Sequence, residues 1–115
     1  MKLISYADSS IRTDDRLADT VLEYAKLLAY LKTADTVTIP YLAESGDLAE
    51  ITMLVGPSSQ VTASSDDEHA FPGDSLPAIE EIERRILLRT PRNVAVQERL
   101  PEDELDDDEF DAFGA

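Results

Sequence analysis

Residues 13–32 constrain the fold most strongly, because their apolar side chains recur at the spacing of an α-helix. The stretch reads TDDRLADTVLEYAKLLAYLK, and its apolar stripe contains Leu17, Val21, Tyr24 or Ala25, Leu28 and Leu31. Steps of three and four residues are typical of a helix with one buried face. Either Thr13 or Asp14 can cap the first turn, where the helix dipole favours acidic side chains. Three more apolar residues widen the stripe enough to cover a sheet: Ala18, Leu22 and Ala29.

A β-hairpin is predicted before this helix, within residues 2–13. Ile4 and Tyr6 alternate with polar neighbours, and the letters ADSS that follow have the chemistry of a turn. Ile11 then resumes the alternation. A four-residue loop would place Tyr6 opposite Ile11, with both side chains on the buried face.

Residues 35–57 switch to a period of two, which predicts a second hairpin. Its apolar positions are Val37, Ile39 and Tyr41, then Ile51, Met53 and Val55. If Ile39 faces Met53, all of them lie on one face, which requires a loop with an odd number of residues, most simply 45–47. Pro40 has no N–H to donate, so its strand is expected at a sheet edge or with a bulge. A short strand at 60–63 is also predicted.

A second helix is predicted within residues 75–90, with Ser75 as its cap and Pro77 in its first turn. Its expected apolar stripe is Ile79, Ile82, Ile86 and Leu87. The letters RNVAVQE, which follow this helix, are a candidate final strand.

These patterns predict an α+β fold in one small domain. An antiparallel sheet of two β-hairpins is covered by one long helix, in the order ββαββ, and a second helix follows. The predicted organisation is a ββαββ core at 1–65, a mobile acidic loop at 66–75, the second helix with a short strand at 76–97, and a disordered acidic tail at 98–115.

The net charge of −15 is concentrated in that acidic tail (residues 98–115), which has nine acidic side chains and one basic one. Residues 1–97 carry −7, from 16 acids and 9 bases. Such a field repels nucleic-acid phosphates and anionic membranes, so it favours a basic protein partner and no direct nucleic-acid binding. No apolar run reaches membrane-spanning length, and cysteine is absent, so a cytoplasmic location is expected.

Few side chains suit catalysis, and the sequence predicts no catalytic residue, cofactor or metal site. His69 is the one histidine, and we interpret it as a solvated residue of an acidic loop. The letters GPSSQ match no phosphate-binding pattern, and a turn after a strand is the favoured interpretation. Acid–base chemistry by paired carboxylates is left as a less favoured alternative.

Four arginines after residue 82 form a local basic cluster, here called the arginine patch: Arg84, Arg85, Arg89 and Arg92. Only Glu83 opposes them between residues 82 and 97, which gives a local charge of +3. Basic side chains are favourable at a helix C-terminus, and this explains the patch without a ligand. The alternative is an anion site on which the acidic tail itself rests.

The acidic tail contains apolar residues that solubility alone does not require. The candidate partner-binding residues are Leu105, Asp106, Asp107, Asp108, Glu109, Phe110, Asp111 and Phe113. Charge can steer such a segment to a partner while its aromatic residues anchor it. It resembles the acidic, aromatic C-terminal tip of bacterial single-stranded-DNA-binding proteins, which implies a protein partner. Those tips end in an aromatic residue, whereas Gly114 and Ala115 follow Phe113 here.

Three non-enzymatic functions are compatible with these patterns. The favoured one is an adaptor, regulator or complex subunit that docks a basic partner through the tail. The second is an inhibitor or immunity-type protein that mimics nucleic acid and blocks a basic enzyme with acids such as Asp8, Asp14, Asp15, Asp19 and Glu23. The third is a structural subunit that forms a homodimer through a sheet edge or through Leu87 and Leu88 of the second helix.

Overall fold

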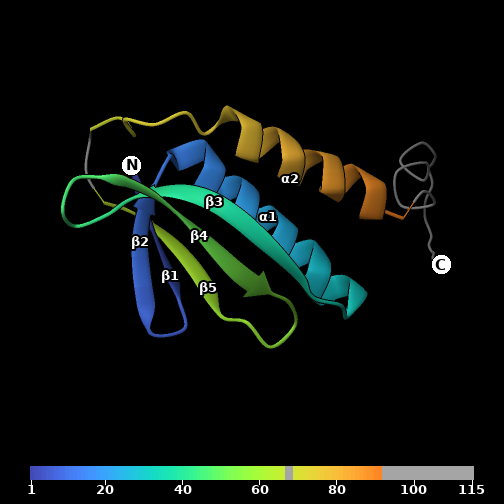
Figure 1. Cartoon of the computed structure of the whole chain (residues 1–115). Coiled ribbons are helices and arrows are strands. Elements are labelled where there is room, and N and C mark those ends of the chain that lie inside the picture. The colour runs from blue at the N-terminus through green and yellow to red at the C-terminus, as the bar shows by residue number, and fades with distance from the viewer. Residues whose placement is uncertain (67–68, 92–115) are drawn as a thin grey trace.

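The computed structural model describes residues 1–66 and 69–91. These residues form five strands and two helices, joined by loops (Figure 1). In chain order they are β1 (Lys2–Tyr6), β2 (Ser9–Thr13), α1 (Asp15–Leu31), β3 (Asp35–Leu42), β4 (Leu48–Val55), β5 (Val61–Ser65) and α2 (Leu76–Arg89). The α+β fold with an antiparallel sheet is therefore confirmed. The candidate final strand, Arg92 and the whole acidic tail lie outside the described residues.

The five strands are ordered β4-β3-β2-β1-β5, and every neighbouring pair is antiparallel. β3 and β4 pair along their whole length, whereas β2 and β3 pair at Arg12 and Leu42 alone. The β3–β4 hairpin consequently diverges from the other three strands (Figure 1). The Tyr6 side chain of β1 connects the two groups of strands, since its hydroxyl donates a hydrogen bond to the Leu54 carbonyl on β4. The core is formed by side chains of the strands together with those of both helices.

The first hairpin has a shorter loop than the sequence suggested. Its turn is Ala7-Asp8, so Ile4 pairs with Ile11 and Tyr6 pairs with Ser9. The predicted pairing of Tyr6 with Ile11 is wrong. Ala7 adopts a φ of 53°, in the left-handed region that tight two-residue hairpin turns require. Ile4 and Ile11 are nevertheless buried on the same face.

The second hairpin has the predicted odd loop, but its register differs by two residues. Ile39 pairs with Ile51, and the loop comprises residues 43–47. The loop closes through the Ala43 N–H, which donates to the Asp47 carbonyl at 2.8 Å. Because strand side chains alternate with a period of two, this shift leaves every residue on its predicted face. Four of the predicted apolar residues are buried: Val37, Ile39, Met53 and Val55.

Pro40 lies in β3, which is an interior strand of the sheet rather than an edge. The expectation of an edge position is therefore wrong. The side of β3 that faces β2 is paired at Leu42 alone, so the missing N–H of Pro40 costs little there. The Pro40 carbonyl accepts a hydrogen bond of 2.8 Å from the buried hydroxyl of Thr13.

α1 begins as predicted, since the Asp14 carboxylate accepts a hydrogen bond of 3.1 Å from the Leu17 N–H. Its buried face packs on β1 and β5. The fully buried residues of the predicted stripe are Leu17, Val21, Tyr24 and Leu28.

α2 packs against α1 and β3 through a narrower face than expected. Ile79 and Ile82 are buried and Ile86 is half-buried, whereas Leu87 is 77% exposed. Leu87 was wrongly predicted to join this stripe, because one step along a helix turns a side chain by about 100°. Ser75 is the residue before the helix but its side chain makes no capping bond, and Asp74 accepts from the Leu76 N–H instead, at 3.2 Å.

Gly56 follows β4 and is buried against the connection between α1 and β3. A Cβ atom at Gly56 would lie 2.8 Å from the Cβ of Ala34 and 3.1 Å from the Thr33 carbonyl oxygen. We expect Gly56→Ala to lower the free energy of unfolding by about 1–2 kcal/mol, as overpacking does. Urea unfolding measures this, and Ala34→Gly should recover part of the loss when the two changes are combined. An equal loss in both backgrounds would show that the Ala34 methyl is not the obstacle.

Candidate interaction surfaces

Asp35 lies where three elements meet, at the start of β3. Its carboxylate accepts hydrogen bonds from the Tyr24 hydroxyl of α1 at 2.5 Å and from Nη1 of Arg85 of α2 at 3.0 Å. The Thr36 N–H donates to it at 2.8 Å, and Nη2 of Arg89 lies 3.8 Å away. The side chain of Asp35 is 24% exposed. These contacts tie both helices to the sheet.

The pKa values of this cluster shift in opposite directions. The Tyr24 hydrogen bond lowers the pKa of Asp35 most, with help from the Thr36 N–H and the two arginines, while burial opposes the shift. Burial raises the pKa of Tyr24 most, and the carboxylate of Asp35 raises it further. At neutral pH the pair therefore holds one proton, on the tyrosine.

The arginine patch is largely paired within the protein. Arg84 Nη2 and Arg85 Nε each lie 2.8 Å from Oε2 of Glu81, and these two arginines lower the pKa of that carboxylate. Arg85 also binds Asp35, from which it is separated by 50 positions in the sequence. Arg84 and Arg89 keep 59% and 37% of their side chains exposed. An anion site on the patch stays a prediction, with these two exposed groups as its described members.

Acidic side chains in and next to α1 also form contacts within the protein. The N-terminal ammonium lies 3.3 Å from Asp15 and donates to the His69 carbonyl at 2.8 Å. Lys2 Nζ lies 2.7 Å from Asp19, and this hydrogen bond raises the pKa of the lysine. With Asp14 acting as the helix cap, three of the five body acids considered for phosphate mimicry have intramolecular partners. A rigid acidic array on the body is therefore less favoured.

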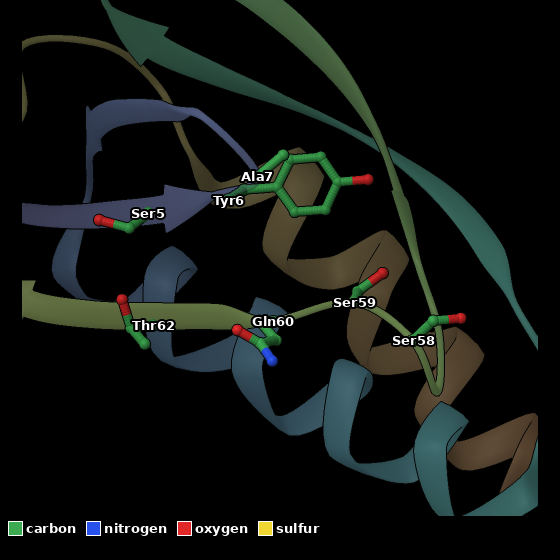
Figure 2. Close-up of a pocket in the computed structure, with 7 residues that line it drawn as sticks. All are labelled: Ser5, Tyr6, Ala7, Ser58, Ser59, Gln60 and Thr62. Carbon is green, nitrogen blue, oxygen red and sulfur yellow. The ribbon is translucent and has the colours of Figure 1, made fainter.

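A shallow hollow of about 510 Å³ separates the tip of the first hairpin from the loop between β4 and β5 (Figure 2). We call it the hydroxyl hollow, and it is lined by Ser5, Tyr6, Ala7, Ser58, Ser59, Gln60 and Thr62. The Ser59 N–H donates to the Gly56 carbonyl at 3.0 Å, which confirms the predicted turn in GPSSQ. The lining of the hydroxyl hollow includes neither charged side chains nor histidine. The hollow can thus exchange hydrogen bonds with neutral groups, but its lining supplies no general base.

A more apolar groove lies between the C-terminal halves of α1 and α2, with a volume of about 390 Å³. We call it the C-terminal groove, and it is lined by Glu23, Lys26, Leu27, Tyr30, Ile86, Thr90 and Pro91. The two helices end at the same end of the molecule, where the described chain also stops (Figure 1). Tyr30, which lines this groove, is 69% exposed. This is apolar surface that the described residues leave open.

Neither a metal cluster nor a membrane span is found in residues 1–66 and 69–91. No group of three or more acidic or histidine side chains there could hold a metal ion. Neither helix is both long and apolar enough to cross a bilayer. No known protein family, curated protein or solved structure matches the chain.

The sequence reasoning missed both Asp35 and the C-terminal groove as sites. Asp35 was treated as the first residue of a strand, yet Tyr24 gave a usable signal. A tyrosine in the buried stripe of a helix needs a partner for its hydroxyl. The groove gave a weaker signal, because Leu27 and Tyr30 lie beside the main stripe of α1 and looked like ordinary surface residues.

Proposed function

We propose that the protein is a non-enzymatic, cytoplasmic interaction module that docks a basic protein partner through its acidic tail. The observation that carries the proposal is how the acidic side chains are distributed along the chain. On the body, Asp14, Asp15, Asp19, Asp35 and Glu81 are each engaged by a backbone amide, a tyrosine or a cation. The tail concentrates nine further acids around three large apolar residues.

The two kinds of side chain in the tail would have different roles. Its carboxylates raise the rate of encounter with a basic surface, and this effect weakens as salt screens the charges. Phe110 and Phe113 supply the apolar area that anchors a complex. A tail of this kind can bind an enzyme that handles nucleic acid and inhibit it, so the inhibitor function is a version of the same proposal.

A second candidate function, a homodimeric structural subunit, is favoured by specific exposed surfaces. Leu87 and Leu88 are 77% and 72% exposed on α2. β4 forms one edge of the sheet and has Leu48 and Leu54 exposed. Light scattering at two concentrations separates the candidates, because a dimer gains mass as concentration rises.

The proposal is tested by affinity capture with two baits, the full chain and residues 1–100. We expect the truncated bait to lose the basic partner, because the anchors and most tail acids are gone. The matched control is the full-length Phe110→Ser/Phe113→Ser variant, which keeps the net charge. Its affinity for the captured partner should fall at least about tenfold, since two anchors contribute more than about 2 kcal/mol. A partner retained equally by all three baits would exclude the tail as the recognition element.

A further inference from the structure

The C-terminal groove has the properties of a site for an aromatic side chain. Leu27 and Ile86 line it with half-buried apolar side chains, and the exposed ring of Tyr30 also belongs to its lining. Its volume of about 390 Å³ lies within the range of sites that hold small ligands or side chains. An apolar group that entered would remove both its own surface and that of Tyr30 from water, which is favourable.

The charges around the groove favour an occupant with carboxylates. Lys26 lines it, Lys32 caps the same end of α1, and Arg89 lies in the last turn of α2. Glu23 is the one acidic residue in the lining. No ion pair involves Lys26 or Lys32 among the described residues, so both cations can serve a ligand.

The chain itself supplies a segment of this chemistry. Pro91 is part of the groove lining and is the last described residue, so residues 92–115 begin at the groove. Phe110 and Phe113 lie there among carboxylates. A flexible linker of the length from Pro91 to Phe110 spans about 25 Å, so the aromatics can reach the groove. Such tethering gives an effective concentration of about millimolar, and weak binding is then enough.

We propose that the C-terminal groove binds residues 105–113 of the same chain, with Phe110 and Phe113 placed against Leu27, Tyr30 and Ile86. This differs from a resting place on the arginine patch, where Arg84 and Arg85 are already held by Glu81. The inference rests on the proposed function in one respect, because the same aromatics would engage the partner. A partner must then displace them from the groove.

Because the chain has no cysteine, Ala112→Cys provides a single position for a nitroxide spin label. We expect the label to broaden the methyl NMR signals of Leu27 and Ile86, and this broadening should vanish when the nitroxide is reduced. The methyl signals of Leu48, on the far β4 edge, serve as an internal reference. No partner is present, so failure here would leave the capture experiment unaffected.

Two exposed residues of α1 and α2 give a matched pair of variants. Tyr30→Ser removes part of the groove, and we expect it to reduce the broadening to below roughly half. Leu87→Ser removes a similarly exposed apolar side chain outside the groove lining, and it should leave the broadening unchanged. Loss of broadening in Phe110→Ser/Phe113→Ser would confirm which tail residues bind. Equal effects of Tyr30→Ser and Leu87→Ser would overturn the assignment to the groove.

The remaining outcomes also decide the proposal. Binding between copies is detected in a mixture of two chains. One carries the spin label and no NMR-active isotopes, and the other is isotope-enriched and carries no spin label. Broadening in that mixture equal to that in the labelled chain would replace the proposal with a dimer that exchanges tails. Broadening of backbone amide signals that is strongest at Arg84 and Arg85 would place the tail on the arginine patch. Absence of broadening at Leu27 and Ile86 would show that the groove does not bind the tail.

Discussion

Replacing Ile82 by alanine is expected to lower the free energy of unfolding by about 2–4 kcal/mol. Ile82 is 2% exposed and belongs to the core cluster, where α2 meets α1 and β3. Among the described elements, α2 makes its main contacts with α1 and β3, so a cavity at this position weakens its attachment. A small domain has a net stability of only several kcal/mol, and such a loss is a large part of it.

The matched control is Leu87→Ala, five residues further along α2. Its side chain is 77% exposed, so we expect a change within about 0.5 kcal/mol. Urea unfolding followed by circular dichroism measures both variants. If Ile82→Ala and Leu87→Ala cost the same, α2 does not pack on α1 through the Ile79–Ile82 face. That result would also remove the C-terminal groove, which depends on the same packing.

The hydrophobic periods of the chain predicted the described helices and strands and most of their buried residues, with Leu87 of α2 as an exception. Ile39 and Met53 were placed on the correct side although their register differs by two residues, because a period of two is insensitive to an even shift. Loop lengths were harder to predict. The turn at Ala7 depends on a left-handed backbone conformation that alanine rarely adopts, and no side-chain pattern announces it.

Charged contacts between distant residues were beyond a local reading of the sequence. The +3 count for the arginine patch omitted Glu81, one residue outside the chosen window, and Asp35, which reaches Arg85 only after folding. A count of charges along the sequence overestimates the charge that is available to a ligand whenever folding brings opposite charges into contact. The tail residues stay a prediction, since they lie outside the described part of the chain.

Asp35→Asn is expected to cost about 2–3 kcal/mol at neutral pH, because it removes a carboxylate that holds Tyr24 and Arg85 and leaves these groups poorly paired. Asp35 has a lowered pKa in the folded protein, so its contribution is complete above the unfolded pKa. That contribution is lost as pH falls through the folded pKa. The difference between wild type and Asp35→Asn should therefore shrink below about pH 4.

The stability difference between wild type and Tyr24→Phe should shrink at alkaline pH, whereas the difference for Asp35→Asn shrinks in acid. The pKa of Tyr24 is raised on folding, so its contribution is complete below about pH 10 and is lost as pH rises through the folded value. We expect a cost of about 1–2 kcal/mol at neutral pH, typical of a hydrogen bond to a charged group. The difference between Tyr24→Phe and wild type should narrow above about pH 10, where ionised Tyr24 would lie beside ionised Asp35.

Urea unfolding across the pH range measures both variants, because urea is uncharged and leaves the ion pairs unscreened. Asp19→Asn is the matched control, since Asp19 forms an exposed ion pair with Lys2 and should contribute little to stability. Similar costs for Asp19→Asn and Asp35→Asn at neutral pH would mean that Asp35 is an ordinary surface carboxylate. A larger cost for Asp35→Asn that disappears in acid, together with an alkaline change confined to chains that keep Tyr24, would show that the Asp35 carboxylate holds α1 through the Tyr24 hydroxyl and α2 through Arg85.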